Sequence, residues 1–362
     1  MKVISVVGAR PQFIKAAPVC RALRERHEEI LVHSGQHYDY GMSDVFFEQL
    51  GIPKPDFNLA VGSGGHGRQT GEMLGALEEL YIEQKPDCVL VYGDTNTTLA
   101  AALAAAKLAI PIAHVEAGLR SYVRDMPEEI NRVLTDHIST LLLCPTSTAM
   151  ANLAAEGIVQ GCVLVGDVML DTARFFAGHE GAAEVLERMG VEPGDYYLAT
   201  VHRASNSDDE GRLSAIVAAF AELDRRVVWA VHPRTTANLE RFGLLETVHA
   251  AGNIVAVPPI SYNETVALLE SAAALLTDSG GMQKEAYFFS VPCVTLRDET
   301  EWVETVELGW NTLVGADRVA ILRAAPAAGS GPHPASHPDV YGDGHAADRI
   351  VEAMEAGLGP RR

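Results

Sequence analysis

Residues 278–286 read DSGGMQKEA, and they follow directly on the apolar stretch 272–277, AAALLT. This order predicts a buried strand that turns through Gly280 and Gly281 into a helix. Because glycine has no Cβ, Ser279, Gly280 and Gly281 can bring backbone N–H groups at a helix N-terminus close to a phosphate. Glu285 comes about one turn later, where its carboxylate can accept from a ribose diol. The stretch predicts a nucleotide diphosphate site, although an ordinary strand–turn–helix junction has the same pattern.

This junction belongs to a longer alternation of short apolar strands with helical patterns, which predicts βαβ units and parallel sheets. The expected strands are 3–7, 30–33, 88–91, 112–115, 141–144 and 163–165, then 196–201, 227–231, 254–257, 272–277, 291–296 and 312–314. We expect two doubly wound α/β domains that meet near residues 165–172. Ligands bind at the carboxyl ends of strands in such sheets, so we expect the active site in a cleft between the domains. Residues 324–338 lack periodicity and predict a loose surface connection before a last helix at 346–356.

Composition narrows the class of protein. The 362 residues are 48% hydrophobic and 21% charged, as in globular proteins of about two domains. A net charge of −20 argues against nucleic acid as a partner. We expect a cytoplasmic protein without a membrane partner, because no apolar stretch reaches membrane-spanning length and the N-terminus does not read as a signal peptide. The five cysteines include no C-x-x-C pair and suit reduced, structural thiols.

Charged residues follow several expected strands of the first half. Arg10 and Lys15 follow the first strand, where a helix begins. Because the helix dipole disfavours cations near a helix N-terminus, their presence there favours a function over ordinary surface charge. Asp94 follows the strand 88–91 and could be a helix N-cap instead of a catalyst. Glu116 closes an apolar strand, so it needs a partner or a raised pKa, as general acids and bases have. Glu128, after a proline, suits either catalysis or the first turn of a helix.

Histidines end two expected strands of the second half. His202, followed by Arg203, and His232 occupy equivalent strand ends, which favours a function over two isolated core histidines. His202 can change protonation near neutral pH, and Arg203 can contact phosphate. We expect no metal site, because no ligand spacing is present.

Residues 62–67, GSGGHG, match the G-x-G-x-x-G pattern of dinucleotide-binding proteins. The stretch before them, 56–61, is a poor buried strand, and the first strand of the chain leads elsewhere. We therefore prefer a glycine loop beside the active site over an NAD site, and we expect no cofactor.

Taken together, these motifs resemble the non-hydrolysing UDP-N-acetylglucosamine (UDP-GlcNAc) 2-epimerases over nearly the whole chain. The resemblance rests on GARP at 8–11, SGQH at 34–37, YGDT at 92–95, HVEAGLR at 114–120, PEE at 127–129, DSGG at 278–281 and ETE at 299–301. It implies two Rossmann-like domains of the glycosyltransferase-B type at 1–167 and 168–344, and a terminal helix, 345–362, that packs back on the first domain. It also implies a homodimer.

The resemblance implies a reaction as well. The family eliminates UDP across C1–C2 of the sugar to give 2-acetamidoglucal and then adds UDP back, with the C2 proton delivered to the other face. Two faces need two acid/base groups, but the resemblance does not assign a carboxylate to each face. The matching positions are Asp94, Glu116, Glu128 and His202 for catalysis, Arg10 and Lys15 near the diphosphate, and Ser279, Gly280, Gly281 and Glu285 for UDP.

Two departures leave the sugar open. Residues 300–304 read TEWVE where many members have TERPE, and 202–206 read HRASN where HRREN is commoner. The first variant resembles relatives that act on UDP-2,3-diacetamido-uronates, which is the alternative substrate. A glycosyltransferase of the same fold is a further alternative and would need an acceptor site.

The family also has a second, regulatory substrate site. Its matching positions here are Gln36, Arg68, Arg203 and His232, and Asp39 replaces a neutral residue of some relatives. Because an added negative charge weakens binding of a diphosphate, we expect weaker regulation by UDP-GlcNAc than in those relatives.

Overall fold

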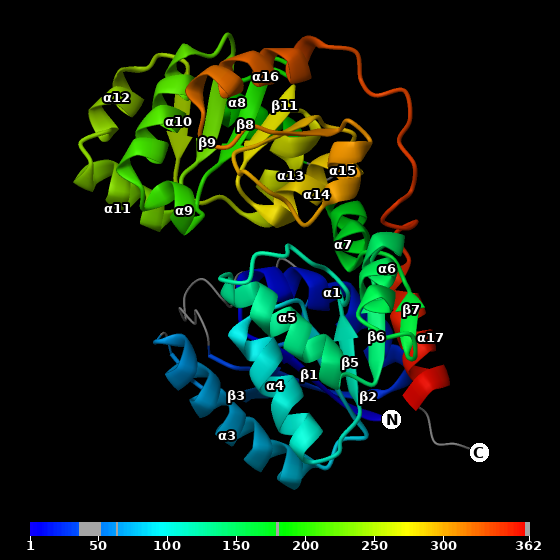
Figure 1. Ribbon diagram of the computed structural model, residues 1–362. Coiled ribbons are helices and arrows are strands. Elements are labelled where there is room, and N and C mark those ends of the chain that lie inside the picture. Colours follow the sequence, from blue (N-terminus) through cyan, green and yellow to red (C-terminus); the bar gives the residue numbers. More distant parts are fainter. Residues whose placement is uncertain (36–51, 63, 179–180, 359–362) are drawn as a thin grey trace. The chain divides into compact units, whose positions relative to one another are not determined.

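A computed structural model describes residues 1–35, 52–62, 64–178 and 181–358 of the chain. It contains two compact units, Met1–Arg174 with Asp339–Arg362 (unit 1) and Phe175–Pro338 (unit 2), and each is described by itself. The chain leaves unit 1 within helix α7, Val168–Phe176, and returns at residue 339. Unit 1 therefore contains both ends of the described chain (Figure 1).

The described strands of unit 1 form one parallel sheet of seven strands in the order β3-β2-β1-β4-β5-β6-β7. The strands are β1 Lys2–Val7, β2 Glu28–His33, β3 Phe57–Asn58, β4 Cys88–Tyr92, β5 Ile112–Val115, β6 Leu141–Cys144 and β7 Cys162–Leu164. All residues of β4, β5 and β6 are buried, as expected for central parallel strands covered on both faces.

Helices cover both faces of this sheet (Figure 1). They are α1 Arg10–Arg26, α3 His66–Gln84, α4 Asn96–Lys107, α5 Pro127–Ile138, α6 Ser147–Ala155 and α17 Ala346–Leu358. Helix α4 reads NTTLAAALAAAK, and its buried alanines let it pack closely on α3 and on the sheet. The terminal helix α17 contacts α1 and β6 of the same unit.

Unit 2 repeats the design with a parallel sheet of six described strands in the order β10-β9-β8-β11-β12-β13. The strands are β8 Tyr196–Thr200, β9 Arg226–Ala230, β10 Ile254–Val257, β11 Ala274–Thr277, β12 Cys293–Thr295 and β13 Asn311–Leu313. The helices are α8 Ala182–Met189, α9 Ala204–Ser207, α10 Glu210–Glu222, α11 Pro233–Arg241, α12 Leu245–Ala250, α13 Tyr262–Glu270, α14 Gly280–Phe288, α15 Val303–Glu307 and α16 Arg318–Ser330. The predicted α/β class with two doubly wound sheets is confirmed.

The prediction of a loose connection at 324–338 is wrong for residues 324–330, whereas residues 331–338 form no helix or strand. Residues up to Ser330 belong to α16, in which Ile321 and Ala325 are buried in the core of unit 2. The remainder is held by ring contacts, because His337 stacks on Tyr287 at 4.1 Å between ring centroids and Trp310 donates from Nε1 to the Ser336 carbonyl at 3.0 Å. Packing against the unit outweighs a composition that is unfavourable for a helix.

Candidate active site

The order of strands reverses at one point in each sheet, and ligands bind outside the carboxyl ends of strands at such points. In unit 1 the reversal lies between β1 and β4, and in unit 2 between β8 and β11. The segments that leave these four strands contain Arg10, Asp94, His202 and Ser279. The topology therefore brings the sequence-predicted residues of each unit to the switch point of its own sheet.

The turn after β4 is held by side chains at three successive carbonyls. Gln12 Nε2 and Thr98 Oγ1 donate to the Tyr92 carbonyl at 2.8 and 2.7 Å. A ring nitrogen of His114 lies 2.8 Å from the Gly93 carbonyl, and Asn131 donates to the Asp94 carbonyl at 2.9 Å. Gln12 also accepts from the N–H groups of residues 8 and 9, so it connects the turns after β1 and β4.

Glu116 has a backbone conformation that a non-glycine residue adopts only at a cost. Its φ is +70°, in the left-handed region, and such strain costs about 1–3 kcal/mol and is concentrated at functional sites. Its buried carboxylate forms an ion pair with the Lys15 ammonium. A Cβ at Gly93, whose φ is +64°, would lie 3.1 Å from Lys15 Nζ and 3.4 Å from Glu116 Oε2. Glycine at 93 therefore makes room for this ion pair.

Asp94 is paired with a cation that sequence reasoning did not single out. Its carboxylate accepts from the guanidinium of Arg132 on α5, while the N-cap of α4 is Thr95. The alternative role of Asp94 as an N-cap is therefore wrong. The Asp94 side chain keeps 28% of its surface exposed, so it remains accessible to a ligand.

Glu128 and Glu129 differ although they are neighbours in the first turn of α5. Glu129 is buried and accepts from the N–H groups of Ser121 and Tyr122 at 2.9 Å each, and from Arg132 at 3.0 Å. It therefore holds the loop before α5. Glu128 is half-buried and, within the described part of the chain, makes no hydrogen bond or ion pair, which leaves its carboxylate available for chemistry.

The glycine turn of unit 2 forms the predicted helix N-terminus. Helix α14 begins at Gly280, and the Ser279 hydroxyl accepts from Met282 N–H as its N-cap. A Cβ at Gly280 would lie 2.4 Å from Glu301 Oε1, so a side chain at 280 would force this carboxylate to move. Glu301 is an ion-pair partner of Arg297, with 3.1 Å between the charged atoms. Gly281 follows within the first turn.

Glu285 lies on α14 and is buried, and its Oε1 accepts from the Tyr262 hydroxyl at 2.8 Å. Tyr262 begins α13, so this contact joins two helices of unit 2. The tyrosine fixes one oxygen of the carboxylate and is a contact that the sequence did not predict.

The turn after β8 is organised by Asp278, which is completely buried. Its carboxylate accepts from the N–H groups of His202 and Arg203 at 3.0 Å and from Asn206 at 3.1 Å. The ring Nδ1 of His202 lies 3.4 Å from the same carboxylate. Burial lowers the pKa of His202 and Arg203 lowers it further, while the charge of Asp278 opposes both. His202 is therefore favoured as a neutral imidazole, which can accept a proton.

The residues predicted for a regulatory site are not brought together within the described part of either unit. Arg68 is exposed on α3 of unit 1 and pairs with Glu72 at 2.7 Å. Arg203 and His232 belong to unit 2, where the rings of His202 and His232 are 6.0 Å apart. Gln36, Asp39 and the side chain of Arg10 lie outside the described residues.

The glycine-rich segment 62–67 lies between the edge strand β3 and helix α3, whose N-cap is Gly65. It does not follow the first strand of the sheet, where dinucleotide-binding proteins have their glycine turn. Residue 63 lies outside the described residues.

Two doubly wound units with glycine turns and charged side chains at their switch points define a two-unit enzyme of the glycosyltransferase-B type. Residues 21–355 match the family model described as UDP-N-acetylglucosamine 2-epimerase. The chain belongs to this family of isomerases.

Relatives align over almost the whole chain. A UDP-N-acetylglucosamine 2-epimerase homolog of Methanococcus maripaludis is 51% identical over 98% of this chain and 99% of its own. The UDP-2,3-diacetamido-2,3-dideoxy-D-glucuronate 2-epimerase of Pseudomonas aeruginosa is 49% identical over 98% and 99%. A crystal structure of Methanocaldococcus jannaschii UDP-GlcNAc 2-epimerase in complex with UDP-GlcNAc and UDP superimposes with a TM-score of 0.91 at 41% identity, covering 99% of this chain and 100% of that one.

Proposed function

We propose that this chain is a non-hydrolysing UDP-GlcNAc 2-epimerase, which interconverts UDP-GlcNAc and UDP-N-acetylmannosamine (UDP-ManNAc). The observation that carries the proposal is Glu116, a buried carboxylate in strained backbone that is paired with Lys15 beside the Asp94 turn. Family membership and the complex of the M. jannaschii relative with UDP-GlcNAc support the choice of substrate.

In the proposed reaction, a base removes the proton at C2 of the sugar while the C1–O bond to UDP breaks. The electron pair of the C–H bond forms the C1–C2 double bond of 2-acetamidoglucal, and UDP leaves with the electrons of the C1–O bond. In the return step UDP adds to C1 and an acid delivers a proton to the opposite face of C2. Asp94, Glu116 and Glu128 are the proposed acid/base groups, because a carboxylate in a fixed position can act as a general acid or base.

Unit 2 supplies the proposed nucleotide contacts. Gly280 and Gly281 offer the N–H groups of the α14 N-terminus, where the helix dipole favours an anion such as a diphosphate, and Ser279, whose N–H donates to Thr277 Oγ1 at 2.9 Å, can offer its hydroxyl. Glu285 is the proposed acceptor for the ribose hydroxyls, and its Oε1 is oriented by the Tyr262 hydroxyl. His202, held by Asp278, together with Arg10 and Lys15, stabilises the negative charge that develops on the leaving diphosphate.

The proposal extends to location, assembly and cofactors. The enzyme is cytoplasmic and a homodimer. It needs no redox cofactor, since elimination and re-addition transfer no hydride, and it needs no metal. Among the described helices, none is long and apolar enough to cross a membrane. Gln36, Arg68, Arg203 and His232 are proposed to form a regulatory substrate site with weakened binding, tested by whether trace UDP-GlcNAc accelerates UDP-ManNAc turnover.

The experiment is incubation of the purified protein in D₂O with UDP-GlcNAc and, in parallel, with UDP-2,3-diacetamido-2,3-dideoxyglucuronate, followed by NMR. We expect UDP-ManNAc that carries deuterium at C2. Faster conversion of the uronate by more than tenfold would assign that sugar as the substrate. Release of UDP with free ManNAc would contradict a non-hydrolysing enzyme, and transfer of the sugar to an added acceptor would indicate a glycosyltransferase.

A further inference from the structure

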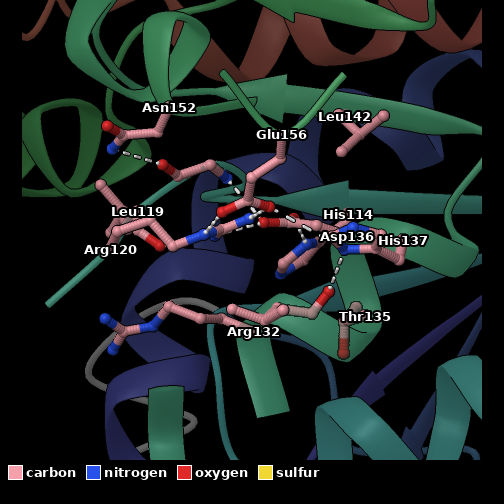
Figure 2. Close-up of polar contacts among 12 residues, drawn as sticks. His114, Leu119, Arg120, Arg132, Thr135, Asp136, His137, Leu142, Asn152 and Glu156 are labelled. Carbon is pink, nitrogen blue, oxygen red and sulfur yellow. Dashed lines mark hydrogen bonds and ion pairs between the residues drawn. The ribbon is translucent and has the colours of Figure 1, made fainter. Parts of the chain in front are cut away.

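His114 is completely buried on β5. This strand leads to Glu116, and it pairs with β4, which leads to Asp94. Its Nδ1 lies 2.7 Å from Asp136 Oδ1, and its Nε2 lies 2.8 Å from the Gly93 carbonyl oxygen. Figure 2 shows the ring of His114 beside Asp136, with Arg120 and Glu156 facing each other next to them. Both ring nitrogens therefore have an oxygen as their neighbour.

The neighbours determine which nitrogens carry hydrogen. A carbonyl oxygen only accepts, so Nε2 of His114 must donate to Gly93. Burial opposes ionisation of Asp136, but the hydrogen bonds and charges of His114 and Arg120 outweigh it and hold the pKa of this carboxyl below its ordinary value. Asp136 Oδ2 already accepts from Arg120 and from Gly118, and a hydrogen between Nδ1 of His114 and Asp136 Oδ1 completes a ring that is held at both nitrogens.

Charged residues surround this pair. Asp136 Oδ2 accepts from Arg120 Nη1 at 2.7 Å, and Arg120 donates to both oxygens of Glu156 at 2.6 and 2.7 Å. Arg120 therefore links the two carboxylates. His137, the neighbouring residue on α5, is exposed and donates from Nδ1 to the Val133 carbonyl of its own helix at 2.9 Å, and the same nitrogen lies 3.9 Å from Glu156 Oε2.

This group contacts the backbone on both sides of the proposed acid/base residues. His114 holds the carbonyl of Gly93, the residue before Asp94, and the Gly93 N–H donates to the Val115 carbonyl at 3.0 Å. Asp136 Oδ2 accepts from the N–H of Gly118, two residues after Glu116, at 3.1 Å. The His114–Asp136 pair therefore fixes the turn of Asp94 and the turn of Glu116 relative to each other.

We propose that His114, held between Asp136 and the Gly93 carbonyl, is a positioning residue of the reaction: through the Gly93 carbonyl it sets the distance between the Asp94 turn and the Lys15–Glu116 pair. This inference rests on the proposed function in that Asp94 and Glu116 are the groups positioned. It predicts that loss of the ring slows proton transfer while UDP binding is unchanged, because the ring of His114 bonds to Gly93 and Asp136, which are not among the proposed UDP contacts.

The test compares His114→Phe, which loses both donors, with His114→Gln, whose amide can still donate to the Gly93 carbonyl. The control is His137→Gln, next in the same close-up but exposed. For each, kcat is divided by the number of UDP-binding sites measured by calorimetry. We expect kcat per site to fall at least tenfold in His114→Phe, to recover at least threefold of that loss in His114→Gln, and to stay unchanged in the control, with the Kd for UDP within twofold throughout.

Should His114→Phe fail to fold, Asp136→Asn is judged by the same threshold, because it keeps the ring and removes the charge that pairs with it. A fall of less than tenfold, or a rise of the UDP Kd by the same factor as the fall in kcat, would overturn the positioning role. Absence of recovery in His114→Gln would overturn the role of the Gly93 carbonyl.

A second measurement does not depend on activity, so it separates this inference from the proposed function. In ¹⁵N-histidine NMR of the wild-type protein at pH 7, assigned by the resonances missing in His114→Gln, Nε2 of His114 should have the shift of a protonated nitrogen. An unprotonated Nε2 would overturn the inference even if the enzyme epimerises UDP-GlcNAc, whereas an inactive wild type with a protonated Nε2 at 114 would overturn only the proposed function.

Discussion

The two units have the same doubly wound architecture but build their switch points from different chemistry. Unit 1 fixes its acidic residues there with cations, in the pairs Lys15–Glu116 and Arg132–Asp94. Unit 2 uses mainly backbone N–H groups, which Asp278 accepts from residues 202 and 203 and which the N-terminus of α14 presents. A carboxylate side chain can accept and release a proton, whereas a backbone N–H group can only stabilise a negative charge. The comparison therefore supports the proposal that unit 1 carries the acid/base chemistry and that unit 2 supplies most of the nucleotide contacts.

The largest expected effect concerns the carboxylates of unit 1. Asp94→Asn, Glu116→Gln and Glu128→Gln should each lower kcat by about 10²-fold or more, because an amide cannot act as an acid or base. UDP binding should survive, since these variants leave Arg10, Lys15 and the proposed contacts of unit 2 in place. Steady-state kinetics and calorimetry check this, with the exposed Glu79→Gln on α3 as control. Near-normal kcat in all three variants would remove the chemistry from unit 1.

The next effect sharpens the description of unit 1 and concerns His33, a buried histidine that is held neutral. Burial lowers the pKa of His33 from 6.5 to about 4, and its Nδ1 accepts from the Gly35 N–H at 2.7 Å. Between these values the unfolded chain binds more protons than the folded one, so stability falls as the pH is lowered through this range. From pH 7 to pH 5 we expect a loss of about 2 kcal/mol from this group.

Urea unfolding of wild type and His33→Asn at both pH values measures that loss. Asparagine keeps an acceptor for the Gly35 N–H but does not titrate, so its unfolding free energy should depend less on pH by the same amount. Equal pH dependence in the two proteins would show that His33 is not held neutral.

A smaller effect is expected in unit 2. Glu285→Ala should raise KM about tenfold with little change in kcat, as loss of a charged hydrogen-bond acceptor for the nucleotide does. Tyr262→Phe, which removes the hydroxyl that contacts Glu285 Oε1, should raise KM less. Thermal unfolding of both variants controls for loss of fold. A fall in kcat at constant KM would place Glu285 in the chemistry and break the division between the units.

The smallest effect is none at all: removing bound nucleotides and then adding NAD should leave the rate unchanged. The glycine-rich segment 62–67 follows the edge strand β3 and not the first strand, so it lacks the setting of a dinucleotide site. A rate that depends on added NAD would show that both the segment and the redox-free mechanism were misjudged.

Sequence reasoning located several strands well from short apolar runs. The strands at 112–115, 141–144 and 254–257 have the predicted bounds. It failed at α16, because Pro326 and several small residues hide a helix that forms by packing on the core of unit 2.

In the candidate site, the sequence predicted the residues at strand ends but not the partners that hold them. Asp94, Glu116, His202 and Ser279 could be proposed from sequence because parallel strands deliver their carboxyl ends to one edge. Their partners could not. Arg132 lies 38 positions after Asp94 and Asp278 lies 76 after His202, and only the packing of helices and loops selects them.

The proposed mechanism requires that UDP leaves the sugar and adds back before UDP or 2-acetamidoglucal escapes from the enzyme. Positional isotope exchange tests this directly, with UDP-GlcNAc that carries ¹⁸O in the bridge between C1 and the β-phosphorus. If the C1–O bond breaks and the bound diphosphate rotates, ³¹P NMR should show ¹⁸O moving into non-bridging positions of the β-phosphate while UDP-ManNAc forms. Epimerisation with all ¹⁸O retained in the bridge would contradict elimination and re-addition.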